Sequence, residues 1–370
     1  MTAGSEANPL ALKIKDRIRR EGPIPVSEYM RICLGDPEHG YYRTRIAIGA
    51  GGDFTTSPEI SQTFGELIGI WTAVAWRAMG APAQVNLVEL GPGRGTMMAD
   101  MLRAGRIVPG FLGAARVHLV ESSPILRDVQ RQTLAKSAEQ VPIIWHETFA
   151  VEFAGDQPTI LLANEFLDAL PVCQLVFTRG EWRRRCVGLD TNGEFAFVPG
   201  EAVVPERLPT DRAPREGDIF EFHPDFPRIA DLLQQLAAKP LAALFIDYGH
   251  IASAFGDTLQ AVRQHRYASV LEHPGEADLT AHVDFETFRR HCVERKLAVD
   301  GPITQAQFLL NLGLAERSQK LMSTARPEEI GLIEAGVQRI ADPFGMGGRF
   351  KVICVRSPNV PALPPFPPTS

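Results

Sequence analysis

The segment from Val85 to Thr96, VNLVELGPGRGT, constrains the fold more than any other stretch of the sequence. Its apolar first half predicts a buried strand of a parallel sheet. The three glycines Gly91, Gly93 and Gly95 then allow the backbone to turn sharply without Cβ clashes, so that a ligand can approach the bare main chain. Such a strand-to-helix turn also directs unpaired amide N–H groups and the positive end of a helix dipole at the ligand.

The spacing of these glycines favours one class of ligand. A dinucleotide fingerprint has its third glycine three positions beyond the second, whereas this chain has G-x-G-x-G. A carboxylate two residues before the first glycine would repel a pyrophosphate and suit a cationic group. The pattern E-x-G-x-G-x-G resembles the first motif of Rossmann-like methyltransferases, whose cofactor S-adenosyl-L-methionine carries a sulfonium and an ammonium. A tight structural turn is the alternative. On this resemblance, the candidate cofactor-binding residues are Glu89, Gly91, Pro92, Gly93 and Gly95.

Candidate residues also follow the next two predicted strands. The strand RVHLV at 116–120 ends in Glu121, which is followed by Ser122. In doubly wound sheets an acid at this position hydrogen-bonds ribose hydroxyls, although a solvated strand end would explain Glu121 taken alone. After the strand predicted over 141–145, His146 and Glu147 occupy the position from which such folds touch an adenine. We therefore expect these four residues to bind the cofactor.

Polar residues gather at the ends of two more predicted strands. The strand at 159–163 runs into NEFLDALPV, which places Asn164, Glu165 and Asp168 at the carboxyl end of a central strand, where open α/β sheets bind ligands. The later apolar segment LAALFI ends in Asp247. Such groups are costly to bury without a partner, and helix capping explains Asn164 better than Glu165. A ligand site is the favoured interpretation.

Composition narrows the function classes. The 370 residues have ordinary contents of hydrophobic (45%) and charged (22%) residues, which predicts a large core and a main domain with a smaller companion. The net charge of −6 argues against nucleic acid as the main partner. The five cysteines show no C-x-x-C pair and no histidines at metal spacing, so we predict no metal site and a cytoplasmic protein. No apolar run approaches the roughly 18 residues of a membrane span.

The pattern along the chain predicts its organisation. We expect an N-terminal helical cap with a lid loop over 1–83 and a Rossmann-like domain over 84–356. Insertions are expected around 174–235 and 250–340, and a proline-rich tail without core-forming capacity over 357–370. Within these regions the pattern predicts hairpins over 174–198, helices over 301–312 and 328–340, and a closing edge strand over 350–355.

Two segments are candidates for contact with a substrate. The loop GAGGDFTTSPEIS at 49–61 is too long for a plain connector, and it is either a structural Ω-loop or a lid over the cofactor. Its candidate residues are Phe54, Thr56 and Ser57. A polar cluster around His282 could line a substrate channel, although a single histidine is more often a packing residue.

Several stretches together resemble the MidA family, S-adenosyl-L-methionine-dependent methyltransferases related to the mitochondrial complex I assembly factor 7. These stretches are GYY at 40–42, GDFTTSPEIS at 52–61, ELGPGRG at 89–95, VESSP at 120–124, NEFLDALPV at 164–172, IDYG at 246–249 and DLTAHVDF at 278–285. The resemblance extends from Ile24 to about Val355, with Leu167 where the family often has a second aromatic residue.

The resemblance implies a fold, a reaction and a partner. The fold is the α/β, Rossmann-like class I methyltransferase fold with a doubly wound, mostly parallel sheet, an N-terminal helical cap and an inserted smaller α+β lobe. The reaction is symmetric dimethylation of a protein arginine on a respiratory complex I subunit during its assembly. It takes place in the cytoplasm or, for relatives in organelles, in the mitochondrial matrix, and the protein could be a homodimer.

Arginine methylation also needs acids, because a protonated guanidinium repels a sulfonium. We predict that Glu165 clamps the guanidinium, that Asp168 or Asp247 assists or accepts the proton, and that Tyr248 contacts the substrate. Two alternatives stay open: methylation of a small molecule or RNA, and a complex I assembly chaperone that binds the cofactor without essential catalysis. A nicotinamide dehydrogenase is disfavoured by the glycine spacing.

Overall fold

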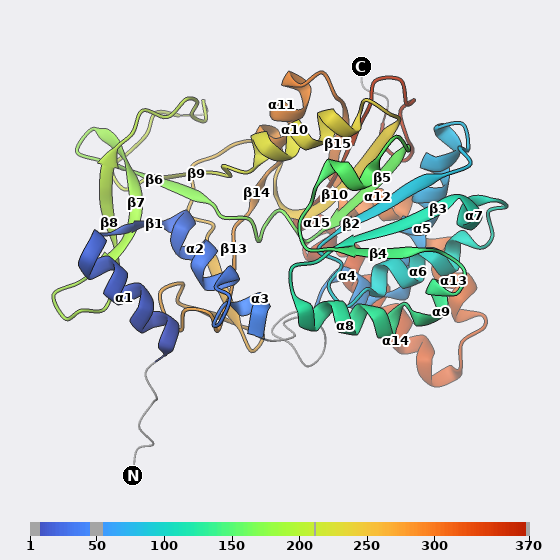
Figure 1. Cartoon of the computed structure of the whole chain (residues 1–370), viewed down its shortest axis with the longest axis horizontal. Coiled ribbons are helices and arrows are strands. Elements are labelled where there is room, and N and C mark those ends of the chain that lie inside the picture. Colours follow the sequence, from blue (N-terminus) through green and yellow to red (C-terminus); the bar gives the residue numbers. More distant parts are fainter. Residues whose placement is uncertain (1–7, 45–54, 211, 368–370) are drawn as a thin grey trace, which may run out of the picture. The chain divides into compact units, whose positions relative to one another are not determined.

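The computed structural model describes residues 8–44, 55–210 and 212–367, and the chain divides into two compact units (Figure 1). Each unit combines segments that are separated in the sequence. Unit 1 contains Met1–Phe54, Ala169–Asp225 and Ala252–His282, and unit 2 contains Thr55–Asp168, Phe226–Ile251 and Val283–Ser370. The first boundary between the units therefore lies near residue 54, and not at residue 83 where we expected the N-terminal cap to end.

Unit 2 is organised around a mostly parallel sheet, which confirms the predicted fold class. Its strands are β2 (Val85–Leu90), β3 (Ala115–Val120), β4 (Ile143–His146), β5 (Thr159–Asn164), β10 (Leu241–His250), β14 (Val283–Asp284), β15 (Ala298–Thr304) and β16 (Phe350–Arg356). The order is β15-β16-β10-β5-β2-β3-β4, with β14 paired to β10. Strands β10, β5, β2, β3 and β4 run parallel, whereas β16 pairs antiparallel with both β10 and β15.

The chain order of these strands locates the expected ligand site. From β2 the chain proceeds outward to β3 and β4, and it then returns to β5 on the other side of β2. The strand order therefore reverses between β2 and β5. In open α/β sheets, ligands bind outside the carboxyl ends of the strands at such a reversal.

Helices cover both faces of this sheet (Figure 1). Helices α5 (Gln62–Ala78), α6 (Thr96–Gly105), α12 (Gln305–Asn311) and α14 (Pro327–Ala341) share one hydrophobic core with alternate strand residues. On the other face, the rings of Phe245 on β10 and Phe288 on α11 (Phe285–Glu294) are 4.9 Å apart, and α10 (Phe226–Leu236) packs beside α11. The other helices of unit 2 include α4 (Ser57–Ile60), α7 (Phe111–Ala114), α8 (Pro124–Thr133), α9 (Ala135–Ala138), α13 (Leu314–Met322) and α15 (Met346–Arg349).

Two predictions about the C-terminal part of unit 2 were wrong. Residues 298–304 form strand β15, which places β16 inside the sheet and not at its edge, whereas α12 (Gln305–Asn311) is the helix predicted within 301–312. The Gly301–Pro302 pair conceals this strand in the sequence, because proline cannot donate to the ladder and the register shifts there. The proline-rich tail does contribute to the core, since Leu363 and Phe366 are buried and the Phe366 ring lies 5.6 Å from that of Phe308.

Unit 1 contains the predicted hairpins and the N-terminal helices. The chain forms α1 (Pro9–Glu21), β1 (Ile24–Pro25), α2 (Val26–Gly35), α3 (Tyr41–Thr44), β6 (Cys173–Thr178), β7 (Glu181–Leu189), β8 (Phe195–Ala202), β9 (Ile219–Phe222), β11 (Gln260–Arg263), β12 (Arg266–Ala268) and β13 (Asp278–Thr280). Antiparallel pairing gives the order β1-β7-β6-β9, with β8 on β7, and a separate sheet β12-β11-β13. Within the three described ranges of the two units, no helix has the length and apolar character that a membrane crossing requires.

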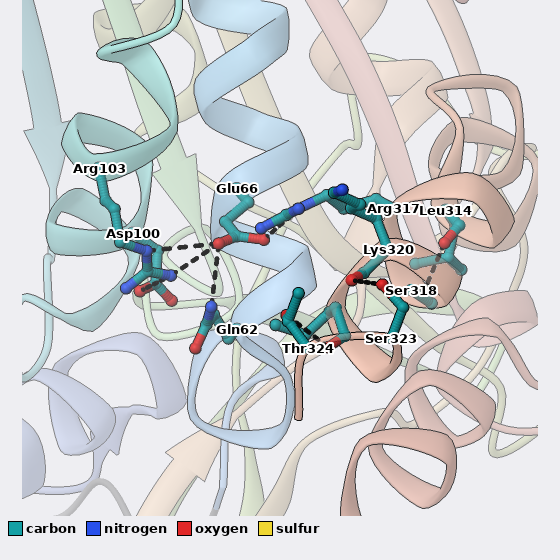
Figure 2. A network of polar contacts seen from close by, with 11 residues as sticks. Gln62, Glu66, Asp100, Arg103, Leu314, Arg317, Ser318, Lys320, Ser323 and Thr324 are labelled. Carbon is teal, nitrogen blue, oxygen red and sulfur yellow. Dashed lines mark hydrogen bonds and ion pairs between the residues drawn. The ribbon is translucent and has the colours of Figure 1, made fainter. Parts of the chain in front are cut away.

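A buried ion-pair network ties three helices of unit 2 together (Figure 2). Glu66 of α5 is only 2% exposed, and its Oε1 accepts hydrogen bonds from Gln62 Nε2 and Arg103 Nη2, both at 2.9 Å. Its Oε2 accepts from Arg317 Nε of α13 at 2.6 Å, and Arg103 of α6 also pairs with Asp100. Burial acts to raise the pKa of Glu66, but the hydrogen bonds outweigh burial and lower it. These contacts therefore explain how the charge of Glu66 is compensated in the interior.

Candidate functional site

The glycine turn after β2 adopts a backbone that only glycine accepts easily. Gly91, Gly93 and Gly95 have φ angles of +62°, +55° and +80°, and Gly95 is the N-cap of α6. A Cβ on Gly91 would lie 3.1 Å from the ring of Phe166, which follows β5. The turn thus lies against the segment after β5, at the point where the strand order reverses.

Two buried oxygen atoms beside this turn have no hydrogen-bond partner within the described residues. They are Oε2 of Glu89, whose side chain is 3% exposed, and Oδ1 of Asn164. Glu89 is the penultimate residue of β2 and Asn164 is the last residue of the neighbouring β5. Burial raises the pKa of Glu89 to about 8. Both atoms would be satisfied by a cationic or hydrogen-donating ligand group.

The ends of β3 and β4 carry the next predicted residues. Glu121 is buried, and its Oε1 accepts from the N–H of Ser123 at 2.7 Å, whereas the neighbouring Ser122 is exposed. At the end of β4, His146 Nε2 lies 3.0 Å from Nδ1 of His118. Burial lowers the pKa of both histidines, that of His118 to about 4. His146 is therefore held as a neutral ring within an imidazole pair.

The start of unit 2 contacts both strand-end turns. The N–H of Ser57, which is fully buried, donates to Oε1 of Glu165 at 3.0 Å. Two residues on, Glu59 accepts a hydrogen bond from Thr96 Oγ1 at the beginning of α6. Thr56 is also buried, whereas Phe54 lies outside the described residues. Residues 56–59 of the predicted loop thus contact the turns that follow β2 and β5.

Glu165 has a strained backbone and a fixed carboxylate. Its φ angle of +52° is unusual for a side chain of this size, and such strain is commonly found at functional sites. Its Oε1 accepts from Asn164 Nδ2 at 3.2 Å in addition to the N–H of Ser57. These contacts fix one carboxylate oxygen of Glu165 on the side of the loop.

Asp247 at the end of β10 anchors the turn that follows β5. Its Oδ2 accepts the N–H groups of Phe166, Leu167 and Asp168 at 3.1, 2.8 and 3.2 Å, and its Oδ1 accepts the N–H of Tyr248 at 3.0 Å. Burial, together with the charges of Asp168 and Glu165, raises its pKa, which the backbone donors oppose. Four backbone N–H groups therefore occupy the carboxylate oxygens of Asp247.

The other predicted residues are placed as follows. Glu147 is exposed after β4, and the ring of Tyr248 packs against that of Phe350 with centroids 5.6 Å apart. His282 belongs to unit 1, where its N–H donates to Oγ1 of Thr258 at 2.9 Å. The part of the chain that the structure describes has no group of three or more potential metal ligands.

Sequence reasoning missed Gln130 of α8, which hydrogen-bonds to Gly93, Glu121 and Trp145. A signal for it exists, because Leu126, Gln130 and Leu134 lie four residues apart on the buried side of α8 and its C-terminal end. A polar residue on such a stripe requires buried partners. The sequence alone did not indicate which partners these are.

Known proteins resemble this chain over nearly its whole length. Residues 67–303 match the family model of S-adenosyl-L-methionine-dependent methyltransferases. The chain is 36% identical to the "Protein arginine methyltransferase NDUFAF7 homolog, mitochondrial" of Drosophila melanogaster, covering 95% of this chain and 86% of that protein. It is 37% identical to the "Protein arginine methyltransferase NDUFAF7, mitochondrial" of Homo sapiens, covering 94% and 83%. A Burkholderia thailandensis crystal structure with bound S-adenosyl-homocysteine is similar with a TM-score of 0.79 and 27% identity, covering 96% of this chain and 93% of that chain.

Proposed function

This chain belongs to the family of S-adenosyl-L-methionine-dependent methyltransferases, and from that membership we propose that it methylates an arginine side chain of a protein. The membership confirms the resemblance seen in the sequence and the predicted cofactor. The relatives are named protein arginine methyltransferases, which supports arginine as the acceptor. We further propose that the acceptor lies on a subunit of respiratory complex I and becomes symmetric dimethylarginine.

The residues around the glycine turn fit this cofactor. When bound, S-adenosyl-L-methionine supplies an electrophilic methyl group on a positively charged sulfur. The turn at Gly91, Gly93 and Gly95 offers bare backbone, and Oε2 of Glu89 and Oδ1 of Asn164, which have no partner among the described residues, offer acceptors for a cationic group. A bound cation would stabilise the ionised form of Glu89, which burial disfavours in the free protein. Glu121 at the end of β3 is proposed to accept from the ribose hydroxyls.

The observation that carries the arginine proposal is the group of acids at the ends of β5 and β10. Glu165, Asp168 and Asp247 lie close enough for the first two to raise the pKa of the third. Such a group compensates the charge of a guanidinium beside a sulfonium and orients its nitrogen. Glu165 and Asp168 follow β5, the strand next to β2 and its glycine turn, and Asp247 lies on the adjacent β10, so acceptor and cofactor would meet at one edge of the sheet.

The three acids would have different roles. We propose that Glu165 hydrogen-bonds the guanidinium, because contacts with Ser57 and Asn164 fix one of its carboxylate oxygens. Each methyl added to nitrogen replaces one N–H hydrogen, so a proton must leave the guanidinium. We propose that Asp168 or Asp247 accepts this proton, since the two carboxylates lie close enough for the charge of Asp168 to raise the pKa of Asp247.

The role of Glu165 is tested by Glu165→Gln, with the exposed Glu139→Gln as the matched control. We expect Glu165→Gln to keep S-adenosyl-L-methionine binding within about twofold and to lower methyl transfer by about 100-fold, the cost of an interaction made with the reacting group. Methyl transfer is measured on complex I subunits purified from cells that lack the gene. Unchanged transfer in Glu165→Gln would eliminate the proposed role.

The acceptor is tested in cells with and without the gene by mass spectrometry of complex I subunits. We expect one or more arginines to lose symmetric dimethylation when the gene is absent and to regain it with the wild-type gene. Rescue of complex I assembly by Glu165→Gln without methylation would favour the assembly chaperone. Gly93→Val tests the cofactor site itself, because valine is strained at a φ of +55°. Normal cofactor binding by this variant in calorimetry would contradict the site.

The cellular compartment and the oligomeric state stay predictions. From the cysteine pattern we expect a cytoplasmic protein. The names of the relatives describe those proteins as mitochondrial. Gel filtration with light scattering would test the predicted homodimer.

A further inference from the structure

Gln130 of α8 joins three neighbouring strand ends with one side chain. It is fully buried, and its Nε2 donates to the carbonyl oxygen of Gly93 at 2.8 Å and to Oε2 of Glu121 at 3.2 Å. Its Oε1 accepts from Nε1 of Trp145 at 3.0 Å. Gly93 follows β2, Glu121 follows β3 and Trp145 lies on β4, and these strands are consecutive in the sheet. Gln130 therefore connects the ends of three strands that carry candidate cofactor residues.

Only an amide satisfies these three partners. The carbonyl of Gly93 and the carboxylate of Glu121 both need a donor, whereas the indole N–H of Trp145 needs an acceptor. The amide of Gln130 supplies two N–H groups and one oxygen, and the partners fix which way it points. A carboxylate at this position would set acceptor against acceptor, and a thioether would supply no donor.

The bond to Gly93 fixes the orientation of a peptide group in the glycine turn. Because C=O and N–H point in opposite directions in a trans peptide, a Gly93 carbonyl held toward α8 directs the N–H of Arg94 away from this helix. The bond to Glu121 holds one carboxylate oxygen, while the N–H of Ser123 holds the other. A single buried side chain thus determines the geometry of two separate ligand-binding groups.

We propose that Gln130 is a positioning residue, which holds the Gly93 peptide and the Glu121 carboxylate in the orientations that cofactor binding requires. It acts through these two groups and does not itself touch the cofactor. The proposal rests on the cofactor roles proposed above for the glycine turn and for Glu121.

Loss of Gln130 would also change the protonation of Glu121. Burial raises the pKa of Glu121, whereas the hydrogen bonds from Ser123 and Gln130 and the charge of Arg127 lower it. The N–H of Glu121 donates to the carbonyl of His146 on β4, and burial lowers the pKa of that imidazole. Removal of Gln130 takes away one of the hydrogen bonds that lower the pKa of Glu121, so that its carboxylate binds a proton more easily. A protonated Glu121 is a poorer acceptor for a ribose hydroxyl.

The test compares Gln130→Met with Gln132→Met, which changes an exposed glutamine on the same helix. S-adenosyl-homocysteine is titrated into each full-length protein by calorimetry at pH 8 and pH 6. We expect Gln130→Met to bind about tenfold more weakly at pH 8, as for the loss of one to two buried hydrogen bonds, and more weakly still at pH 6. Gln132→Met is expected to bind within about twofold of wild type at both pH values. Wild-type affinity in Gln130→Met, or an equal loss at both pH values, would overturn the proposal.

A second pair of variants separates positioning from general destabilisation. Glu121→Gln is made alone and together with Gln130→Met, and the effect of Gln130→Met is expected to be smaller in the Glu121→Gln background. Strict additivity overturns the proposal. If Glu121→Gln alone binds like wild type, the cofactor role of Glu121 fails and the present proposal fails with it. Should Gln130→Met not fold, Gln130→Glu keeps the side-chain volume, and wild-type affinity of that variant at pH 8 would overturn the proposal.

Discussion

Glu66 and Glu89 have nearly the same small solvent exposure in the same unit, yet their surroundings differ. Glu66 is 2% exposed and accepts hydrogen bonds from Gln62, Arg103 and Arg317 (Figure 2). Glu89 is 3% exposed, and its Oε2 has no partner among the described residues. The pKa of Glu66 is lowered, whereas burial raises that of Glu89 to about 8.

This difference distinguishes a carboxylate with a structural role from one that is suited to bind a ligand. A buried charge is stable when it is paired, and Glu66 is paired within the protein itself. Glu89 has no such pair in the described part of the chain and stands two residues before a turn that only glycine can form easily. The free protein therefore bears a cost at Glu89 that a cationic ligand can remove, and solvent exposure alone would not have distinguished the two residues.

The largest expected effect is on the pH dependence of stability. Because the folded pKa of Glu89 is raised above its ordinary value of 4.5, its contribution to stability is complete below 4.5 and is lost as the pH rises. The free energy of unfolding should fall by about 1.4 kcal/mol for each pH unit between 4.5 and about 8 on account of this residue. Glu66 has the opposite sign, since its contribution is present above 4.5 and is lost as the pH falls.

Because other buried acids also titrate in this pH range, the contribution of Glu89 is measured as the difference between the wild type and a variant. Urea unfolding of the cofactor-free wild type and Glu89→Gln is compared at several pH values from 5 to 8. Glutamine carries no titrating proton, so the variant should be the flatter of the two. Parallel curves would show that Glu89 is not held neutral, and the contrast with Glu66 would then fail.

Glu66→Leu is expected to have the next largest effect, on stability alone. It removes the shared partner of Arg103 and Arg317, and we expect a loss of about 3 kcal/mol in the free energy of unfolding. This lies at the low end for a broken buried pair, because both arginine side chains are partly exposed and can turn into water. Urea unfolding measures the loss, and calorimetry should show unchanged affinity for S-adenosyl-homocysteine. A large loss of affinity would mean that Glu66 also supports the site.

The sequence predicts the sheet of unit 2 well because its strands are apolar runs bounded by glycine, proline and polar residues. The prediction fails where glycine or proline interrupts the pattern of a strand or of core residues. The Gly301–Pro302 pair in β15 reads as the start of a helix, and the prolines around Leu363 and Phe366 conceal side chains that complete the core. The division into units was also beyond local patterns, since distant segments form unit 1.

The candidate site shows the same limit at the level of single residues. Acids at the ends of strands can be located from the sequence, because parallel strands bring their carboxyl ends to one edge. Their partners cannot be located in this way. Asp247 was predicted as one of two candidate proton acceptors, but the structure shows its oxygens bound to backbone N–H groups of residues about 80 positions earlier and of the next residue. Gln130 was not predicted at all, because its partners lie at the ends of three different strands and only the fold brings them together.

Glu89→Gln should also weaken the binding of S-adenosyl-L-methionine. Glutamine keeps the size of the side chain but removes the negative charge that a cationic ligand would stabilise, so we expect about 30-fold lower affinity at pH 8. The wild type should release a proton on binding at pH 7, because the ligand favours the ionised form of Glu89. Calorimetry in two buffers of different ionisation enthalpy measures this release, and Glu139→Gln is the control. Equal affinity and equal proton release in wild type and Glu89→Gln would place the cation elsewhere.

The smallest expected effect comes from removing one arginine of the Glu66 network. Arg317→Met breaks the 2.6 Å contact to Oε2 of Glu66 but leaves Arg103 and Gln62 on Oε1. We expect a loss of about 1 kcal/mol, because the arginine is partly exposed and the charge of Glu66 keeps one cation. Urea unfolding at pH 7 is compared with that of Arg77→Met, which changes an exposed arginine on the same helix as Glu66. A loss as large as that in Glu66→Leu would show that Arg317 alone compensates this carboxylate, and that Glu66 without it resembles Glu89.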